Sequence, residues 1–233
     1  MKLFVNGCSF SHGHNLTQDN LFPNWTWPYL ITGFDEVVNY AWIGSSNHRM
    51  LRTTLDFFDN VENTAEWVVV IQWTDPYSRT ELYDEESDTY IGYCLGAPGE
   101  VLGLPEYKKF ISNPARFTEQ VNRYEKYGIL TTTRKQQEIN LIHQQLLMST
   151  YLNSKNINFL YTSMSGSGKI DPDYAYPLVK LLPNHNIVDP ISRYVNLMHP
   201  HLIESQTDLH PNKAGHKEIA RYITNELKQR TYL

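Results

Sequence analysis

The sequence predicts an α/β protein with a central parallel sheet that is covered by helices on both faces. Three short and nearly continuous apolar runs, at residues 3–5, 66–73 and 157–161, are typical of strands buried on both sides. Segments with apolar residues at helical spacing lie between and after these runs. Alternating strands and helices favour parallel βαβ units. A chain of 233 residues is long enough for one substantial core, so we expect a single domain over residues 1–233.

Two weaker strands complete the predicted sheet. Residues 37–40 follow the first strand, and residues 187–189 are the candidate for a fifth strand after 157–161. The expected sheet therefore has about five strands.

Each of the three predicted helices has an apolar stripe, and the first and last also have a candidate N-cap. The first covers 46–58 with Ser45 or Ser46 as its cap, and the second covers 133–153. The last helix, about 213–229, follows Asn212, which is a favourable N-cap.

Two long stretches, 75–132 and 163–207, do not fit this alternation. The first is rich in Tyr, Gly, Pro and charge, and the second contains several prolines and little periodicity. Insertions of this length in a compact domain are often lids or binding loops, and surface decoration is the alternative. We expect both to be insertions within the single domain.

Composition limits the classes of partner. The formal net charge is −5 and the Lys and Arg residues are scattered, so no nucleic-acid partner is expected. Two cysteines provide no disulfide framework, which favours a reducing compartment. No apolar run is long enough for a signal peptide or a membrane span. We therefore expect a soluble, cytoplasmic protein without a membrane partner, and the oligomeric state stays open.

The two ends of the chain carry the residues that nucleophilic acyl chemistry requires. Ser9 follows the first strand between Gly7 and Gly13, and Asp208 and His210 lie just before the last helix. A serine hydroxyl needs a base to become a nucleophile, and the base needs an orienting acceptor. We predict that His210 is the base and that Asp208 orients it. The alternatives are that Ser9 only caps a turn, or that a backbone carbonyl orients His210.

These segments resemble the SGNH (GDSL-like) hydrolases. Residues 7–13 resemble the Gly-Asp-Ser-x-x-x-Gly block, with Cys8 in place of the Asp, and 39–47 resemble the Asn-to-Gly block before a helix. Residues 72–75 stand where the family has Gly-x-Asn-Asp, and 208–215 resemble the Asp-x-x-His-Pro block. The resemblance implies a flavodoxin-like, three-layer αβα sandwich.

Two departures from the family pattern concern the site itself. Thr74 stands where the family has the Asn that helps to bind the oxyanion, and Asp208 precedes His210 by two residues rather than three. Both features look like a divergent branch of the superfamily that is associated with tailed bacteriophages. A phage-encoded protein of this kind acts in the host cytoplasm.

The resemblance also implies an oxyanion hole, which acyl transfer requires. Its donors are the backbone N–H groups of Ser9 and Gly44. A third donor is the hydroxyl of Thr74 or a side-chain amide, from Asn47 or Gln72. Asn47 is equally well explained as an ordinary residue at the start of a helix.

The function most consistent with this pattern is an esterase that removes acyl groups, such as acetyl, from a carbohydrate or another small ester. An O-acyltransferase to a sugar or nucleoside hydroxyl uses the same residues. A structural or binding protein that has lost catalysis is the third hypothesis. Neither a cofactor nor a metal is expected, because the histidines at positions 12, 14, 199 and 201 lack metal-ligand spacing.

Overall fold

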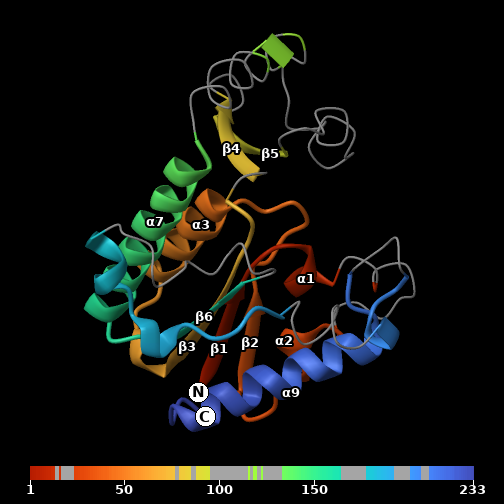
Figure 1. Cartoon of the computed structure of the whole chain (residues 1–233). Helices are drawn as coiled ribbons and strands as arrows, with labels where there is room; N and C mark the ends of the chain where they lie inside the picture. Colours follow the sequence, from red (N-terminus) through yellow and green to blue (C-terminus); the bar gives the residue numbers. More distant parts are fainter. Residues whose placement is uncertain are drawn as a thin grey trace.

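The centre of the protein is a parallel sheet with the strand order β2-β1-β3-β6. Its bounds are Lys2–Asn6 for β1, Glu36–Asn39 for β2, Trp67–Trp73 for β3 and Asn158–Ser163 for β6. The computed structural model in Figure 1 describes residues 1–13, 16, 24–76, 79–84, 88–94, 115, 118–119, 122, 133–163, 177–191, 200–205 and 210–233.

The register of the sheet explains the apolar runs. Leu3 of β1 lies opposite Val37 on one side and Val68 on the other, and Val70 of β3 lies opposite Leu160 of β6. All seven residues of β3 are buried, as expected for a strand covered on both faces. The segment at 187–189 contributes one parallel bridge, between Ile187 and Tyr161, rather than a full strand.

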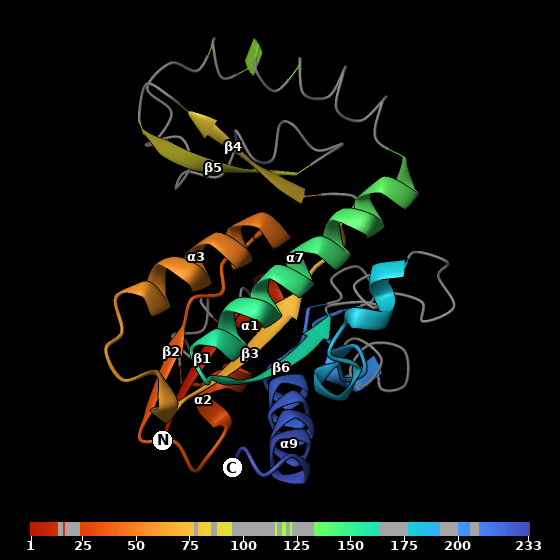
Figure 2. The same ribbon diagram turned by 90° about the vertical axis from the view of Figure 1, so that its left-hand side faces the viewer.

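Helices cover both faces of the sheet, as Figures 1 and 2 show. On one face, α3 (Asn47–Asp59) packs beside α7 (Arg134–Ser154), and on the other α2 (Trp27–Leu30) packs beside α9 (Lys213–Gln229). Most buried apolar side chains of these layers form one continuous core, and Ile142 of α7 belongs to a smaller cluster with Val179 and Leu182. The expected α/β fold with a parallel central sheet is therefore confirmed.

The three long helices begin within one residue of their expected starts, and each follows a side-chain N-cap, although the cap of α7 was not among those predicted. The Oγ atom of Ser46 accepts a hydrogen bond from the Arg49 N–H at 3.2 Å. Thr133 caps α7 in the same way, and Asn212 caps α9. The caps themselves lie outside the helices, so α3 starts at 47 and α7 at 134.

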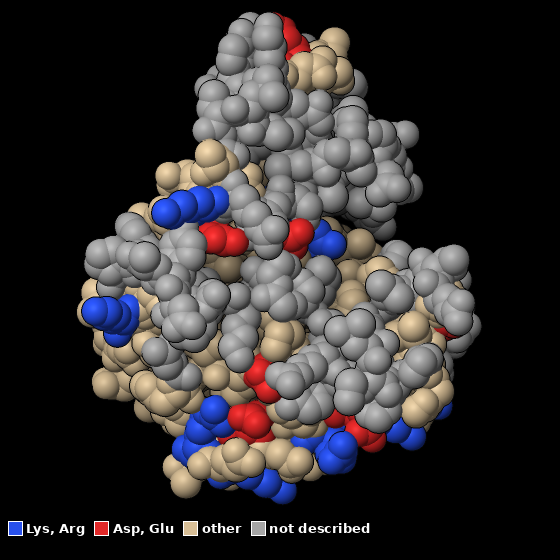
Figure 3. Space-filling model, in the orientation of Figure 1, with Lys and Arg blue, Asp and Glu red and all other residues tan. Residues whose placement is uncertain are grey.

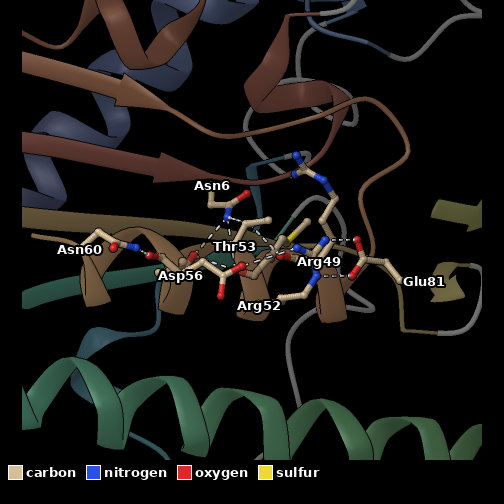
Figure 4. Close-up of polar contacts among 9 residues, drawn as sticks. Asn6, Arg49, Arg52, Thr53, Asp56, Asn60 and Glu81 are labelled. Atoms are coloured by element: carbon tan, nitrogen blue, oxygen red, sulfur yellow. Dashed lines mark hydrogen bonds and ion pairs between the residues drawn. The ribbon is translucent and has the colours of Figure 1, made fainter. Parts of the chain in front are cut away.

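The first predicted insertion contains a feature that was not expected, an antiparallel hairpin of β4 (Arg79–Asp84) and β5 (Thr89–Cys94). Arg52 of α3 binds it through two hydrogen bonds to the carboxylate of Glu81, at 3.1 and 2.8 Å (Figure 4). The Glu81 side chain is only 4% exposed. The Arg52 guanidinium also lies 4.3 Å from the ring centre of Tyr90. One arginine thus connects the hairpin to the central layers.

Apart from single bridges at Ile187 and Ile203, the regular elements in the described part of the second predicted insertion are short helical turns. These are η5 (Pro177–Leu181), η6 (Asn184–Asn186) and η7 (Pro200–Leu202). A further turn, η2 (Thr64–Glu66), leads into β3, which explains why that strand begins at 67 rather than 66.

Charged residues of both signs lie side by side along α9, at the lower edge of the face in Figure 3. Arg221 pairs with Glu218 at 2.6 Å, and Arg230 pairs with Glu226 at 2.7 Å. Among the residues that the structure describes, no helix has both the length and the apolar character needed to cross a membrane.

Candidate active site

The order of the strands places a topological switch point at the carboxyl ends of β1 and β3. The chain runs from β1 to β2 on one side of the sheet and then to β3 on the other side. Ligands in open parallel sheets bind at such a switch point, because the two connections leave in opposite directions. Ser9 follows β1 and Thr74 follows β3. Both therefore lie at the edge where this fold binds ligands.

Ser9 is the first residue of a single helical turn, α1 (Ser9–His12). Cys8 occupies the N-cap position, and its carbonyl oxygen accepts a hydrogen bond from the Ser11 N–H at 3.0 Å. Gly13 ends the turn with a φ of +83°, and a Cβ at this position would lie 2.2 Å from Cγ2 of Thr26. Both observations explain the second glycine of the serine motif.

Asn6 connects the end of β1 to α3, as Figure 4 shows. Its Oδ1 accepts the Gly7 N–H at 2.9 Å, and its Nδ2 lies 2.8 Å from Oγ1 of Thr53 and 3.1 Å from Oγ1 of Thr54. Asn6 is fully buried, so these bonds compensate its loss of water. Our reading of the sequence missed this residue, although a polar side chain between an apolar strand and a glycine was a usable signal.

The structure brings the two ends of the chain together at the serine. The Nε2 atom of His210 lies 2.8 Å from Oγ of Ser9, within hydrogen-bonding distance. Ser9 is 4% exposed, and the ring centre of Phe10 lies 5.2 Å from that of His210. This is the geometry in which an imidazole can take the proton of a serine hydroxyl.

Asn212 holds the segment that carries His210. Its Nδ2 donates hydrogen bonds to the carbonyl oxygens of His201 at 2.9 Å and Ile203 at 3.0 Å, while its Oδ1 caps α9. The carbonyl oxygen of His210 accepts a hydrogen bond from the Glu204 N–H at 3.1 Å. A motif residue that we read only as a helix start therefore also fixes the turn next to the imidazole.

Asp208 lies outside the described residues, which leave out 206–209. The identity of the acceptor that orients His210 therefore stays a prediction.

Gly44 lies in the loop between β2 and α3 and has a φ of +72°. A Cβ built at this residue would meet no atom of the described residues within 4 Å, so the space that they leave beside it is open. Glycine is favoured here by the backbone conformation rather than by crowding. The loop is anchored close to the serine turn, because the Trp42 N–H donates to the carbonyl oxygen of Gly7 at 3.1 Å.

Asn47 and Thr74 form a pair, and the pairing changes the interpretation of both. The Asn47 side chain accepts the Thr74 N–H at 2.9 Å and donates to the Thr74 carbonyl oxygen at 3.1 Å. These bonds attach the end of β3 to the start of α3, which is a structural role. Oγ1 of Thr74 accepts a hydrogen bond from Arg79 at 3.2 Å, and Thr74 is fully buried.

Gln72 is also fully buried, and its amide hydrogen-bonds to Ser11 and Cys8.

A second histidine lies behind the site. His216 of α9 is 1% exposed, and its Nδ1 accepts a hydrogen bond from the backbone N–H of Trp27 at 3.2 Å. Burial, assisted by the nearby charge of His210, lowers the pKa of His216 to about 3. His216 is therefore a neutral imidazole near neutral pH, with its proton on Nε2.

Within the described part of the chain, no three His, Cys, Asp or Glu side chains are grouped so that they could hold a metal ion. Of the histidines at 12, 14, 199 and 201, positions 14 and 199 lie outside the described residues.

Solved structures with a similar fold include an esterase and a member of the lipolytic G-D-S-L family. The structure is similar to the psychrotrophic esterase EstA from Pseudoalteromonas sp., with a TM-score of 0.52 and 14% identity over 100% of this chain and 99% of that one. A member of the lipolytic G-D-S-L family from Veillonella parvula has a TM-score of 0.47 and 11% identity, over 98% and 97% of the two chains. At such low identity the similarity concerns the fold alone.

A family model matches residues 23–174, and its description is a family of unknown function, DUF6071. The chain belongs to this family. No curated protein matches the sequence significantly.

Proposed function

We propose that the protein is a serine-dependent ester hydrolase that works through a covalent acyl-enzyme. The observation that carries the proposal is the 2.8 Å approach of His210 Nε2 to Ser9 Oγ, at the edge of the sheet where this fold binds ligands. The full-length similarity of the fold to an esterase supports it.

In the proposed reaction, Ser9 Oγ attacks the carbonyl carbon of the ester while His210 Nε2 takes the hydroxyl proton. The tetrahedral intermediate collapses when the C–O bond to the alcohol breaks and His210 returns the proton to the leaving oxygen. Water then attacks the acyl-Ser9 ester, again with His210 as the base, and releases the acid. Asp208 is proposed to orient His210 and to stabilise its charged form.

The proposed oxyanion donors are the backbone N–H groups of Ser9 and Gly44. The open space beside Gly44 leaves room for the substrate to approach this backbone. Thr74 accepts a hydrogen bond from Arg79 and retains its own hydroxyl proton, so it is the proposed third donor. The Asn47 amide is less suitable, because it is already engaged with the Thr74 backbone.

The proposed substrate is a short acyl ester, such as an acetyl group, on a carbohydrate or small molecule. The partly exposed rings of Tyr40 and Trp42 lie in the segment that leads to Gly44. Such rings combine an apolar face with a polar group, which suits a sugar. Transfer of the acyl group to a sugar hydroxyl instead of water uses the same residues. Product analysis with added alcohols separates the two reactions.

The test is hydrolysis of p-nitrophenyl acetate by the wild type and by Ser9→Ala and His210→Ala. We expect turnover at neutral pH that falls by about 10³-fold or more in either variant. Labelling with a fluorophosphonate, followed by mass spectrometry of the Ser9 peptide, locates the nucleophile. An unlabelled wild type, or equal turnover in Ser9→Ala, contradicts the proposal.

The second candidate is a binding protein of this fold that has lost catalysis. It is favoured by the full burial of Thr74, which stands at the position of the family's oxyanion Asn. Under this alternative the fluorophosphonate leaves Ser9 unmodified, although the protein is folded.

A further inference from the structure

A buried group of polar side chains lies beneath the serine turn. Ser11 of α1 and Gln72 of β3 are each fully buried, and the Ser11 hydroxyl hydrogen-bonds to Oε1 of Gln72. The Nε1 atom of Trp27 lies 3.2 Å from Ser11 Oγ, and the Gln72 Nε2 lies 3.2 Å from Cys8 Sγ. These four residues, Cys8, Ser11, Trp27 and Gln72, are here called the sub-serine cluster.

The hydrogen bonds of the sub-serine cluster all run in one direction, from Trp27 to Cys8. An indole N–H only donates, so Trp27 donates to Ser11 Oγ. Ser11 then donates its own proton to the Gln72 carbonyl oxygen, and the Gln72 NH₂ group donates to Cys8. Each of these polar groups has a partner, and reversing any one bond would leave a buried group unpaired.

The cluster fixes α1 from the side opposite the nucleophile. Residues two apart in a helix point in directions about 200° apart, so Ser9 and Ser11 lie on opposite sides of the turn. Ser9 faces His210, and Ser11 faces Gln72. The carbonyl oxygen of Ser11 also accepts a hydrogen bond from Asn39 Nδ2 at 2.9 Å. A rotation of α1 that moved Ser9 away from the imidazole would break these bonds.

The side chains of Ser11 and Gln72 pack tightly against Gly7. A Cβ at this position would lie 2.8 Å from Ser11 Oγ and 3.0 Å from both Cβ and Oε1 of Gln72. The glycine before the nucleophile is thus required by the side chains of the cluster. Gln72 itself stands where the related third block has a glycine, and Cys8 stands at the Asp of the first block.

We propose that Ser11 and Gln72 are positioning residues, which hold α1 in the orientation that presents Ser9 Oγ to His210 Nε2. The inference rests on the proposed function for its chemical meaning, because a misplaced nucleophile matters only where Ser9 reacts. A displacement of about 1 Å can lower a rate by about 100-fold. Neither residue touches the substrate in this proposal.

The experiment uses two variants, Ser11→Ala and Gln72→Met, with Ser149→Ala as a control. Ser149 has a similarly buried hydroxyl that hydrogen-bonds to the carbonyl oxygen of Gln145 at 2.6 Å, in α7. The first measurement is the rate at which a fluorophosphonate labels Ser9, on protein shown to be folded by circular dichroism. We expect a fall of about 10- to 100-fold in each variant and no change in Ser149→Ala. The double variant should be no slower than the worse single one, because both remove the same restraint.

The second measurement does not depend on reactivity. The side-chain nitrogen resonances of His210, assigned by comparison with His210→Gln, report its hydrogen bond to Ser9. We expect Ser11→Ala and Gln72→Met to shift these resonances toward their positions in Ser9→Ala, with no shift in Ser149→Ala.

The outcomes separate the two proposals. A reactive wild type with unchanged rates and resonances in both variants overturns the positioning role and leaves the esterase proposal intact. An inert wild type whose His210 resonances shift in the variants overturns the esterase proposal and supports the positioning role. An inert wild type with unchanged resonances overturns both.

Discussion

Ser9 and His210 are separated by 201 positions in the chain, and their side chains meet at 2.8 Å. The serine is fixed by the end of β1 and the imidazole by a short turn before α9. The two supports are independent in sequence and meet only across the carboxyl edge of the sheet. Substitutions that loosen either support without removing a reacting group therefore test how the site is built.

Asn212→Asp should separate the stability of α9 from the placement of His210. Aspartate caps a helix as well as asparagine does, but it cannot donate to the carbonyl oxygens of His201 and Ile203. We expect a small change in the free energy of unfolding and a fluorophosphonate labelling rate that falls by about 10-fold. Asn212→Ala also removes the cap and should cost about 1 kcal/mol more.

Thr133→Ala is the matched control for that comparison, because it removes the cap of α7 far along the chain. It should lower stability by about 1 kcal/mol and leave the labelling rate unchanged. Equal labelling in wild type and Asn212→Asp would show that the turn holds His210 without the asparagine.

His216 should make the protein sensitive to acid. Its pKa is about 3 in the folded protein, against about 6.5 in an unfolded chain, so the unfolded state binds the proton more readily. Stability is therefore lost as the pH falls from about 6.5 toward 3. Between pH 7 and pH 5 this one residue should lower the free energy of unfolding by about 2 kcal/mol.

Urea unfolding at the two pH values measures this effect. His216→Asn keeps an acceptor for the backbone N–H of Trp27 but has no imidazole to protonate. The stability of this variant should therefore fall less over the same pH range. The exposed His143 of α7 provides the control, and His143→Asn should behave as the wild type does. The same pH dependence in all three proteins would mean that His216 is not the source.

Two ion pairs of similar length should have different energies. Arg52 and Glu81 approach to 2.8 Å with the carboxylate 4% exposed, whereas Arg221 and Glu218 approach to 2.6 Å with both side chains exposed. A double-mutant cycle with Arg52→Met and Glu81→Gln should give a coupling energy of about 1–3 kcal/mol. The exposed pair should give about 0.5 kcal/mol or less. Equal coupling energies would contradict the assigned role of burial.

Gly13→Ala should be more harmful than Gly44→Ala, although both glycines have a positive φ. The backbone conformation alone costs about 1–2 kcal/mol for alanine. At Gly44 the added methyl meets no atom of the described residues, whereas at Gly13 it would lie 2.2 Å from Cγ2 of Thr26. Thermal unfolding should rank the two variants in this order. Thr26→Ser removes the clashing methyl group and should partly restore Gly13→Ala, whereas no restoration would contradict the clash.

Local patterns were sufficient to predict most of the fold. The apolar runs predicted four strands of the sheet to within about two residues, and candidate N-caps predicted where α3 and α9 begin. The hairpin at 79–94 was missed, because its alternation is weak in a stretch rich in tyrosine and charge. Its attachment depends on Arg52, which belongs to a helix far back in the chain and gives no local signal.

The candidate oxyanion donors show that a motif taken alone does not assign a hydrogen-bond partner to its residues. The sequence indicated the Thr74 hydroxyl as a third donor, with the side-chain amides of Asn47 and Gln72 as substitutes. In the folded protein the Asn47 amide holds the Thr74 backbone, and the Gln72 amide holds Ser11. Hydrogen-bond partners are chosen by three-dimensional position, so residue type alone does not distinguish a donor to substrate from a structural donor.

Residue patterns alone were sufficient for the α/β class, the positions of its main strands and helices, and the choice of the serine and histidine to consider together. These properties follow from periodicity and from short motifs, which act between neighbouring residues. That the imidazole reaches the hydroxyl, and that Asn6, Asn212 and the sub-serine cluster hold this arrangement, follows only from the folded chain. Such contacts join segments that are distant along the chain, and they arise from the packing of the sheet and its two helical layers.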